Sequence, residues 1–223
     1  MKRKLIAAVS SINGGKDTLM NWLQSRLIYE HHYTMSTVRC RFADSLNQAV
    51  SAILGIDGKE LQDRNLKEIP RFVFDNPKHG SVDAWSSRGV QKEVGKLLRD
   101  NLGKDVFINA LDNRYPNPKS ILLISDLRYQ NELEWVCSQG GKVVYIHNEK
   151  AAQAQFNNES ILNDRLEYTA EEKYHYPPES EKLQWDFYNK VEIYDYWLNN
   201  NDWANKKPFD DFVNFVVDYL EQD

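Results

Sequence analysis

The order of residue types near the start of the chain constrains its fold more than any other feature. An apolar run at 5–9 leads into a small polar turn at 10–15, which opens onto Lys16, Asp17, Thr18 and a helix-like segment. Glycines let backbone N–H groups converge on an anion, and the N-terminus of a helix adds partial positive charge. A lysine at this point reaches the outer phosphates of a nucleotide. The pattern therefore predicts a phosphate-binding loop between a first strand and a first helix.

Two residues of this loop depart from the usual G-x-x-x-x-G-K-[ST] pattern. Ser10 stands where the first glycine is expected, and Asp17 stands where a hydroxyl should follow the lysine. The position of the loop directly behind a strand still favours the phosphate-binding interpretation. The alternative is an ordinary strand-to-helix turn, with Gly14 and Gly15 for tightness and Asp17 in the first helical turn.

Strand-like and helix-like segments alternate along the chain and predict the fold class. Strands are predicted at 4–9, 37–42, 120–125, 142–147 and, more weakly, 190–196, and helices at 17–28, 43–54, 86–101, 106–113, 130–138 and 208–219. This alternation indicates βαβ units, a mainly parallel sheet and helices on both faces. We therefore expect a three-layer α/β/α fold of the P-loop NTPase type, with functional residues just after the strands.

Two long polar segments, 58–83 and 148–185, interrupt the alternation. Long irregular segments in a compact domain are usually functional lids or binding loops, or are disordered. A lid suits a phosphoryl-transfer enzyme, because water must be kept out of the reaction. We expect a single domain over 1–223 with these insertions as candidate substrate-binding and lid segments, and surface decoration is the alternative.

Composition narrows the classes of function. A net charge of −5 argues against a protein whose main ligand is duplex nucleic acid. No apolar run approaches the roughly 20 residues that span a membrane. Only Cys40 and Cys137 are present, so no disulfide framework is expected and a reducing cytoplasm is favoured. The five histidines show no metal-ligand spacing.

Asp126 and Arg128 are the clearest candidates after a predicted strand. Asp126 follows four apolar residues after a single serine, and Arg128 comes two positions later. A carboxylate there could hold Mg²⁺ or accept hydrogen bonds from a substrate, while an arginine suits phosphate oxygens. The alternative is that Asp126 caps the next helix and Arg128 pairs with Glu132.

Five blocks of the sequence, in order, resemble the phage-type deoxynucleoside monophosphate kinases of the P-loop nucleoside monophosphate kinase group. The blocks are SSINGGKDT, FADSL, QKEVGKLLRDNLGKDVFINAL, SDLRYQNELEWVCSQGGKVVYI and NNNDWANKKPFDDF. In this family the loop ends in GKDT, so Asp17 becomes a family trait. The resemblance implies transfer of the γ-phosphoryl group of ATP to a deoxynucleoside monophosphate with Mg²⁺, in the host cytoplasm if the protein is phage-encoded.

The resemblance also implies roles for single residues. The residues implied to bind ATP are Asn13, Gly14, Gly15, Lys16, Asp17 and Thr18, with Asp17 and Thr18 beside the metal. Lys16 and Arg128 are the expected catalytic residues. The residues implied to contact the acceptor are Leu46, Asn47, Arg88, Phe107, Asp126, Arg128 and Glu132. Neither polymeric nucleic acid nor a membrane is expected as a partner, and a homodimer is left open.

Several positions differ from the family pattern. Asn47 stands where a lysine is frequent, Phe107 stands where tryptophan is usual, and 146–150 lacks an arginine often found there. Catalysis would then depend more on Arg128, Arg88 or a lid cation such as Arg165. Two other functions stay open: a P-loop kinase with another phosphorylated acceptor (phosphomevalonate-like or dephospho-coenzyme A-like), and a nucleotide-binding protein without turnover.

Overall fold

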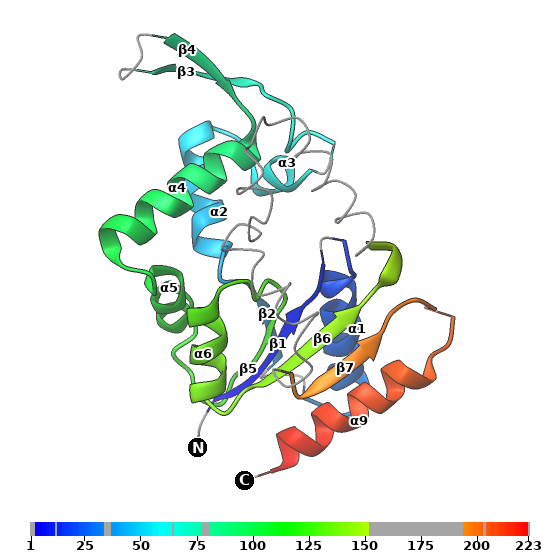
Figure 1. Cartoon of the computed structure of the whole chain (residues 1–223). Coiled ribbons are helices and arrows are strands. Elements are labelled where there is room, and N and C mark those ends of the chain that lie inside the picture. Colours follow the sequence, from blue (N-terminus) through cyan, green and yellow to red (C-terminus); the bar gives the residue numbers. More distant parts are fainter. Residues whose placement is uncertain are drawn as a thin grey trace, which may run out of the picture. The chain divides into compact units, whose positions relative to one another are not determined.

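In the computed structural model the chain divides into two compact units. Figure 1 shows the elements of both units. The residues that the structure describes are 3–11, 13–33, 37–63, 65–76, 81–151, 194–202 and 204–222. The first unit consists of Met1–Arg41 and Tyr115–Asp223, and the second of Phe42–Arg114. Most of the predicted lid segment, from residue 152 to 185, lies outside the described residues, as does Arg165. The single-domain organisation with two insertions stays a prediction.

The first unit is built on a five-stranded sheet in which every pairing is parallel. Its strands are β1 (Lys4–Val9), β2 (Thr37–Cys40), β5 (Ile121–Ile124), β6 (Lys142–His147) and β7 (Tyr196–Asn199). They lie in the order β2-β5-β1-β6-β7, so β1 is the central strand. All but the first residue of β1 are buried, as expected for a strand covered on both faces. The segment after β1 therefore leaves the sheet at the middle of its carboxyl edge.

Helices α1 (Lys16–Tyr29) and α9 (Lys207–Glu221) pack together on one face of this sheet (Figure 1). Their side chains Leu23 and Phe212 belong to one buried cluster with Ile6 and Ala8 of β1. The hydroxyl of Tyr219 on α9 accepts a hydrogen bond from the N–H of Leu5 at 3.3 Å and so fastens the C-terminal helix to β1.

Helix α6 (Gln130–Ser138) covers the opposite face of the sheet. Gly141 lies between this helix and β1: a Cβ added to it would come within 2.8 Å of side-chain atoms of both Leu5 and Val136. Because Leu5 points away from the face that Ile6 lines, α6 and α1 flank the sheet on different sides. The predicted three-layer α/β/α arrangement is confirmed.

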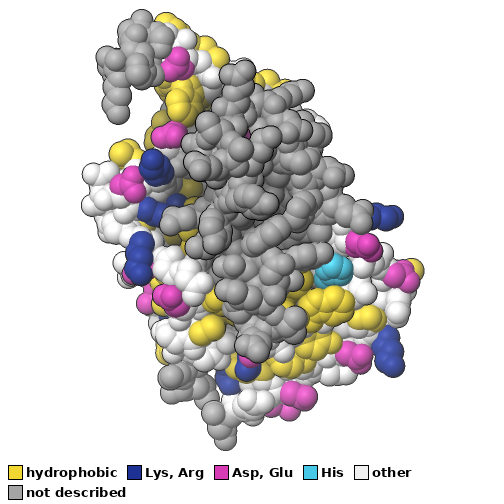
Figure 2. Space-filling view, in the orientation of Figure 1, with side chains coloured by type: hydrophobic (Ala, Val, Ile, Leu, Met, Phe, Trp, Pro, Cys, Tyr) yellow, Lys and Arg dark blue, Asp and Glu magenta, His cyan; other side chains and the backbone are white. Residues whose placement is uncertain are grey.

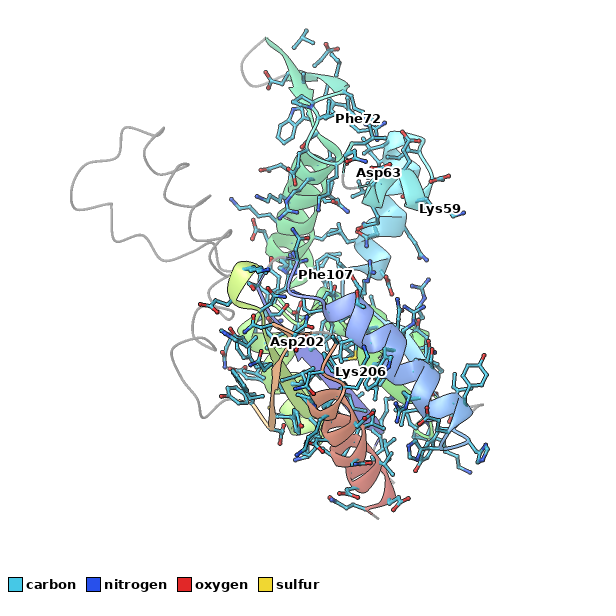
Figure 3. The ribbon with its side chains drawn as sticks, turned by 90° about the vertical axis from the view of Figure 1, so that its right-hand side faces the viewer. Lys59, Asp63, Phe72, Phe107, Asp202 and Lys206 are labelled. Carbon is cyan, nitrogen blue, oxygen red and sulfur yellow. The ribbon has the colours of Figure 1, made fainter. Side chains whose placement is uncertain are left out.

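The second unit combines helices with a small antiparallel hairpin. Its elements are α2 (Asp44–Leu54), α3 (Gly58–Gln62), β3 (Phe72–Asn76), β4 (Ser81–Trp85), α4 (Ser87–Leu102) and α5 (Val106–Arg114). The expectation that 58–83 is irregular was wrong, since the segment holds α3 and the hairpin. Figure 3 labels Lys59 in α3 and Phe72 at the start of β3. Cross-strand pairs such as Phe72 with Trp85 suit a strand pair despite the polar composition around them.

Strand ends differ from the predicted ranges by a few residues. The strand β2 ends at Cys40 and β5 at Ile124, so Arg41 and Ser125 lie just beyond the sheet. The last strand begins at Tyr196 instead of ending there, and 190–193 lie outside the described residues. In the part of the chain that the structure describes, no helix is long and apolar enough to cross a membrane.

A candidate phosphate-binding site

Lys16 is the first residue of α1, and its side chain folds back over the loop that precedes it. Its Nζ donates hydrogen bonds to the carbonyl oxygen and Oγ of Ser10, at 2.8 and 3.0 Å, and to the carbonyl oxygen of Ser11 at 3.2 Å. Burial lowers the pKa of Lys16 from 10.5 to about 7, helped by the charge of Arg128 and opposed by Asp17 and Asp126. All three of these acceptors are neutral oxygens. The negative charge of a nearby phosphate would therefore stabilise the ammonium group further.

The backbone before Lys16 has the conformation that anion-binding loops use. Asn13 and Gly15 adopt left-handed φ angles of 62° and 99°, and such residues form the concave arrays of N–H groups called nests. Gly14 is required by space, because a Cβ there would lie 2.5 Å from Oγ of Ser10. Ser10 itself is buried, and its Oγ also donates to the carbonyl oxygen of Ser11 at 2.9 Å. The serine that replaces the first glycine thus packs against Gly14 and contacts the lysine.

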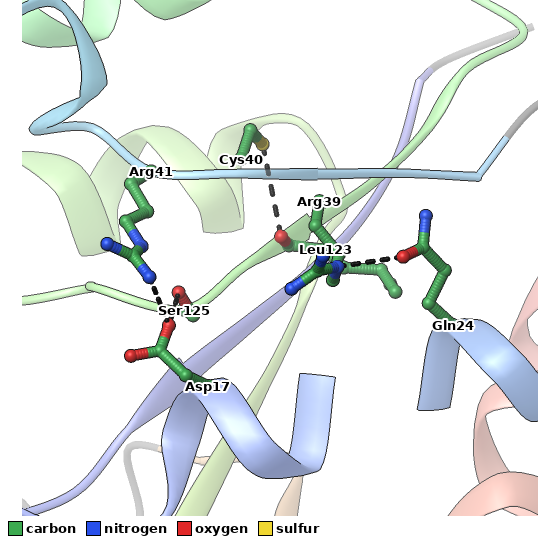
Figure 4. A network of polar contacts seen from close by, with 7 residues as sticks. All are labelled: Asp17, Gln24, Arg39, Cys40, Arg41, Leu123 and Ser125. Carbon is green, nitrogen blue, oxygen red and sulfur yellow. Dashed lines mark hydrogen bonds and ion pairs between the residues drawn. The ribbon is translucent and has the colours of Figure 1, made fainter. Parts of the chain in front are cut away.

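Asp17 joins the start of α1 to the ends of two strands (Figure 4). Its Oδ1 accepts hydrogen bonds from Nη2 of Arg41 at 2.9 Å and from Oγ of Ser125 at 2.8 Å. Arg41 directly follows β2, and Ser125 directly follows β5. Neither was among the predicted site residues, although the rule that functional residues follow strands applies to both.

Asp126, Arg128 and Glu132 lie after β5, the strand next to β1. Asp126 is buried, and the charges of Asp126 and Arg128 both reach Lys16. Oε2 of Glu132 accepts hydrogen bonds from the backbone N–H groups of Arg128 at 2.9 Å and of Tyr129 at 3.1 Å. The carboxylate therefore caps α6 and fixes the backbone from which the exposed side chain of Arg128 extends.

The other predicted acceptor-contacting residues belong to the second unit: Leu46, Asn47, Arg88 and Phe107. Leu46 is buried on α2 and lies close to Gly95 of α4, where a Cβ would come 3.2 Å from Cδ2 of the leucine. Oδ1 of Asn47 accepts a hydrogen bond from Nε2 of Gln91 at 2.8 Å. These two contacts hold α2 against α4.

Arg88 and Phe107 also have partners within the second unit. Nε of Arg88 forms an ion pair with Oε1 of Glu68 at 3.4 Å, and Phe107 is buried with the guanidinium of Arg99 4.6 Å from its ring centroid. A role for the four residues in binding an acceptor stays a prediction.

Asn200, which follows β7, also belongs to the site, and the sequence-based prediction missed it. Its Nδ2 donates a hydrogen bond to the carbonyl oxygen of Gly14 at 2.9 Å, while its backbone N–H donates to His147 at 2.7 Å. A Cβ on Gly15 would lie 2.6 Å from the same Nδ2. The turn that continues from Asn200 carries Asp202 (Figure 3) and leads to α9. The position of Asn200 directly after the last strand could have indicated that it belongs to the site.

The positive charge of the site is local. The chain has a net charge of −5, and on the face drawn in Figure 2 acidic and basic side chains are interspersed. Around the loop, by contrast, Lys16, Arg41 and Arg128 lie at the carboxyl edge of the sheet, in the segments after β1, β2 and β5. This arrangement suits a phosphorylated ligand on an acidic protein.

Asp17 and Thr18, the predicted metal ligands, lie in the first turn of α1 with exposed side chains. Within the described ranges no group of three or more His, Cys, Asp or Glu residues could hold a metal ion by itself. Mg²⁺ bound with a nucleotide usually takes only one or two protein oxygens and keeps several waters. The carboxylate and hydroxyl oxygens of these two residues fit that donor set, and their metal role stays a prediction.

A parallel sheet with helices on both faces, and a glycine loop between β1 and α1 that leads into Lys16, define a P-loop type of α/β fold. No protein-family model matches the chain, and no curated protein sequence matches it.

Solved structures that are similar to the chain over nearly their whole length include the following two. Kti12 of Chaetomium thermophilum, in complex with ADP-AlF3, is 15% identical with a TM-score of 0.42, covering 98% of this chain and 99% of that one. The APS kinase CysC of Mycobacterium tuberculosis, in complex with AMPPNP and APS, is 12% identical with a TM-score of 0.40, covering 99% of each chain. Likenesses this distant do not identify the substrate of this chain.

Proposed function

We propose that this chain transfers the γ-phosphoryl group of ATP to a deoxynucleoside 5′-monophosphate, giving the diphosphate and ADP. The observation that carries the proposal is the position of Lys16 and its glycine loop after β1, beside Asp126 and Arg128 after β5. Because β1 and β5 are adjacent and parallel, both sets of residues leave the sheet at the same edge. A donor phosphate and an acceptor phosphate could therefore meet there.

Phosphoryl transfer depends on positioning and charge neutralisation more than on covalent chemistry. The loop N–H groups and Lys16 would bind the outer phosphates of ATP. The guanidinium of Arg128, on the backbone that Glu132 fixes, would bind the acceptor phosphate, and Asp126 would accept hydrogen bonds from the acceptor. Mg²⁺, held by Asp17 and Thr18, would supply further positive charge to the phosphate oxygens.

The choice of acceptor is supported by the residues themselves. The loop ending in GKDT and the block SDLRYQNE resemble those of phage-type deoxynucleoside monophosphate kinases. The same geometry would also serve another phosphorylated acceptor of similar charge, so the experiment must compare acceptor classes.

The test is a coupled assay of ADP release with each of the four deoxynucleoside monophosphates, and with phosphomevalonate and dephospho-coenzyme A as rival acceptors. We expect turnover with at least one deoxynucleotide and none with the rivals. Lys16→Ala should lose about 10²-fold or more of the activity through lost charge stabilisation, whereas Lys207→Ala, an exposed lysine at the start of α9, should not. Inactivity with every deoxynucleotide would overturn the proposal.

A further inference from the structure

Asp17 poses an electrostatic problem for the proposed function. The usual residue after the lysine of a phosphate-binding loop is a neutral serine or threonine. A carboxylate in the same place adds a negative charge next to the proposed binding site of a triphosphate, and the two negative charges repel each other. The Mg²⁺ proposed to lie beside Asp17 would offset part of this charge when it is bound, and a partner within the protein is needed to offset the charge when the metal is absent.

The structure places a cation and a hydroxyl on that carboxylate (Figure 4). Oδ1 of Asp17 accepts hydrogen bonds from Nη2 of Arg41 at 2.9 Å and Oγ of Ser125 at 2.8 Å. The side chains of Arg41 and Asp17 are 35% and 57% exposed. Exposed ion pairs contribute little to the stability of a fold. A role of this pair in ligand binding is therefore favoured over a role in stability.

The backbone that carries Arg41 is held against its neighbours by several contacts. The side chain of Gln24 on α1 bridges two residues of β2: its Nε2 donates to the carbonyl oxygen of Thr37 at 3.0 Å, and its Oε1 accepts from Nε of Arg39 at 2.7 Å. The backbone N–H of Ser125 donates to the carbonyl oxygen of Cys40 at 3.4 Å, next to Arg41. Both partners of Asp17 therefore stand on fixed backbone.

We propose that Arg41 and Ser125 are positioning residues for ATP binding: they neutralise and orient the Asp17 carboxylate, so that the loop accepts a triphosphate in spite of it. The inference rests on the proposed binding of ATP but not on any acceptor. Arg41 acts through Asp17 and does not bind the phosphates itself. The test must therefore distinguish an effect of Arg41 through Asp17 from direct binding of phosphate by Arg41.

The test is a double-mutant cycle on the full chain, with the dissociation constant of ATP measured by calorimetry in the presence of Mg²⁺ and again with EDTA. Arg41→Ala should weaken binding about tenfold, as expected for a charged hydrogen bond lost beside an anion. In the Asp17→Asn background the same change should cost less than about threefold, because no charge remains to be neutralised. Asp17→Asn alone should bind metal-free ATP as tightly as wild type or more tightly.

Ser125→Ala should weaken binding a few-fold through a freer carboxylate, and Arg41→Lys should recover part of the loss because it keeps the charge. Arg114→Ala removes an exposed arginine at the end of α5 and serves as the matched control, with a change below about twofold. Thermal unfolding of each variant verifies its fold.

An equal cost of Arg41→Ala with and without Asp17 would show that Arg41 binds phosphate directly and would overturn the positioning role. Wild-type chain that binds ATP, shows this coupling and phosphorylates no acceptor would overturn the proposed function and leave the positioning role standing. Wild-type chain that binds no ATP overturns both.

Discussion

Nδ2 of Asn200 lies 2.9 Å from the carbonyl oxygen of Gly14, so the end of the edge strand β7 holds the loop that follows the central strand β1. The contact is a side chain fixing a backbone carbonyl, and such a bond orients the neighbouring N–H groups as well. The affinity of the loop for phosphates should therefore depend on a residue more than 180 positions away in the sequence.

Asn200→Ala removes this bond and should weaken ATP binding by about three- to tenfold, the effect of one neutral hydrogen bond. The dissociation constant measured by calorimetry gives the answer. Asn21→Ala, an exposed asparagine on α1, is the control and should leave the constant unchanged. Equal affinities of the Asn200→Ala variant and wild type would show that the loop keeps its shape without Asn200.

Gly15 and Gly55 provide a matched pair of left-handed glycines next to helix ends. Their φ angles are 99° and 67°, so alanine is strained at either position by about 1 kcal/mol. Only the Cβ added at Gly15 would meet another group, Nδ2 of Asn200 at 2.6 Å, whereas nothing lies within 4 Å of a Cβ at Gly55. We expect both variants to lose stability in urea unfolding but only Gly15→Ala to lose ATP binding. Loss of binding in both would point to a global effect.

Ser10 offers Lys16 one hydroxyl acceptor in addition to the two loop carbonyls. Any contact that the ammonium must give up for a phosphate opposes ATP binding. Ser10→Ala should therefore tighten ATP binding about threefold, with the dissociation constant as the measure and the exposed Ser25→Ala on α1 as the control. Weaker binding would instead mean that the Ser10 hydroxyl supports the shape of the loop.

Burial of Lys16 makes the stability of the protein depend on pH. Its pKa is lowered from 10.5 to about 7, so between these values the unfolded chain holds a proton that the folded chain has released. The free energy of unfolding therefore rises with pH in this window. Wild type should gain stability over Lys16→Met from about pH 7 to about pH 9, by at most about 1.4 kcal/mol per pH unit. Urea unfolding checks this, and parallel curves for the two proteins would contradict it.

The fold and the centre of the site could be predicted from the sequence because their determinants are local. A buried strand, a glycine turn and Lys16 follow one another directly in the chain, and Asp126 lies one serine beyond an unbroken apolar run. Residues that are adjacent in the chain stay close in space in any fold that buries the strand.

Arg41, Ser125 and Asn200 escaped prediction because their roles depend on the order of the strands in the sheet. The order β2-β5-β1-β6-β7 brings together residues that are far apart in sequence, and periodicity does not contain this order. The hairpin of β3 and β4 was missed for another reason: its alternating Phe72 and Phe74 are surrounded by polar residues and prolines, which favour a loop by composition.

Glu132 links stability to the position of Arg128. Its side chain is 3% exposed and accepts two backbone N–H bonds, one of them from Arg128. Glu132→Ala leaves both N–H groups without this acceptor and should cost about 2–3 kcal/mol, while Glu132→Gln, which keeps an amide oxygen, should cost about 1 kcal/mol. Urea unfolding measures both losses, and Glu134→Gln, exposed on the same helix, should change stability by less than about 0.5 kcal/mol.

The same substitution should separate the two halves of the proposed reaction. Because Arg128 stands on the backbone that Glu132 fixes, Glu132→Gln should raise the KM for the deoxynucleoside monophosphate several-fold, yet leave the dissociation constant of ATP within about twofold. Lys16 and its loop follow a different strand and keep their own contacts, so the donor side has no reason to change. A parallel loss of affinity for both nucleotides would mean that Glu132 supports the whole edge of the sheet instead of the acceptor side alone.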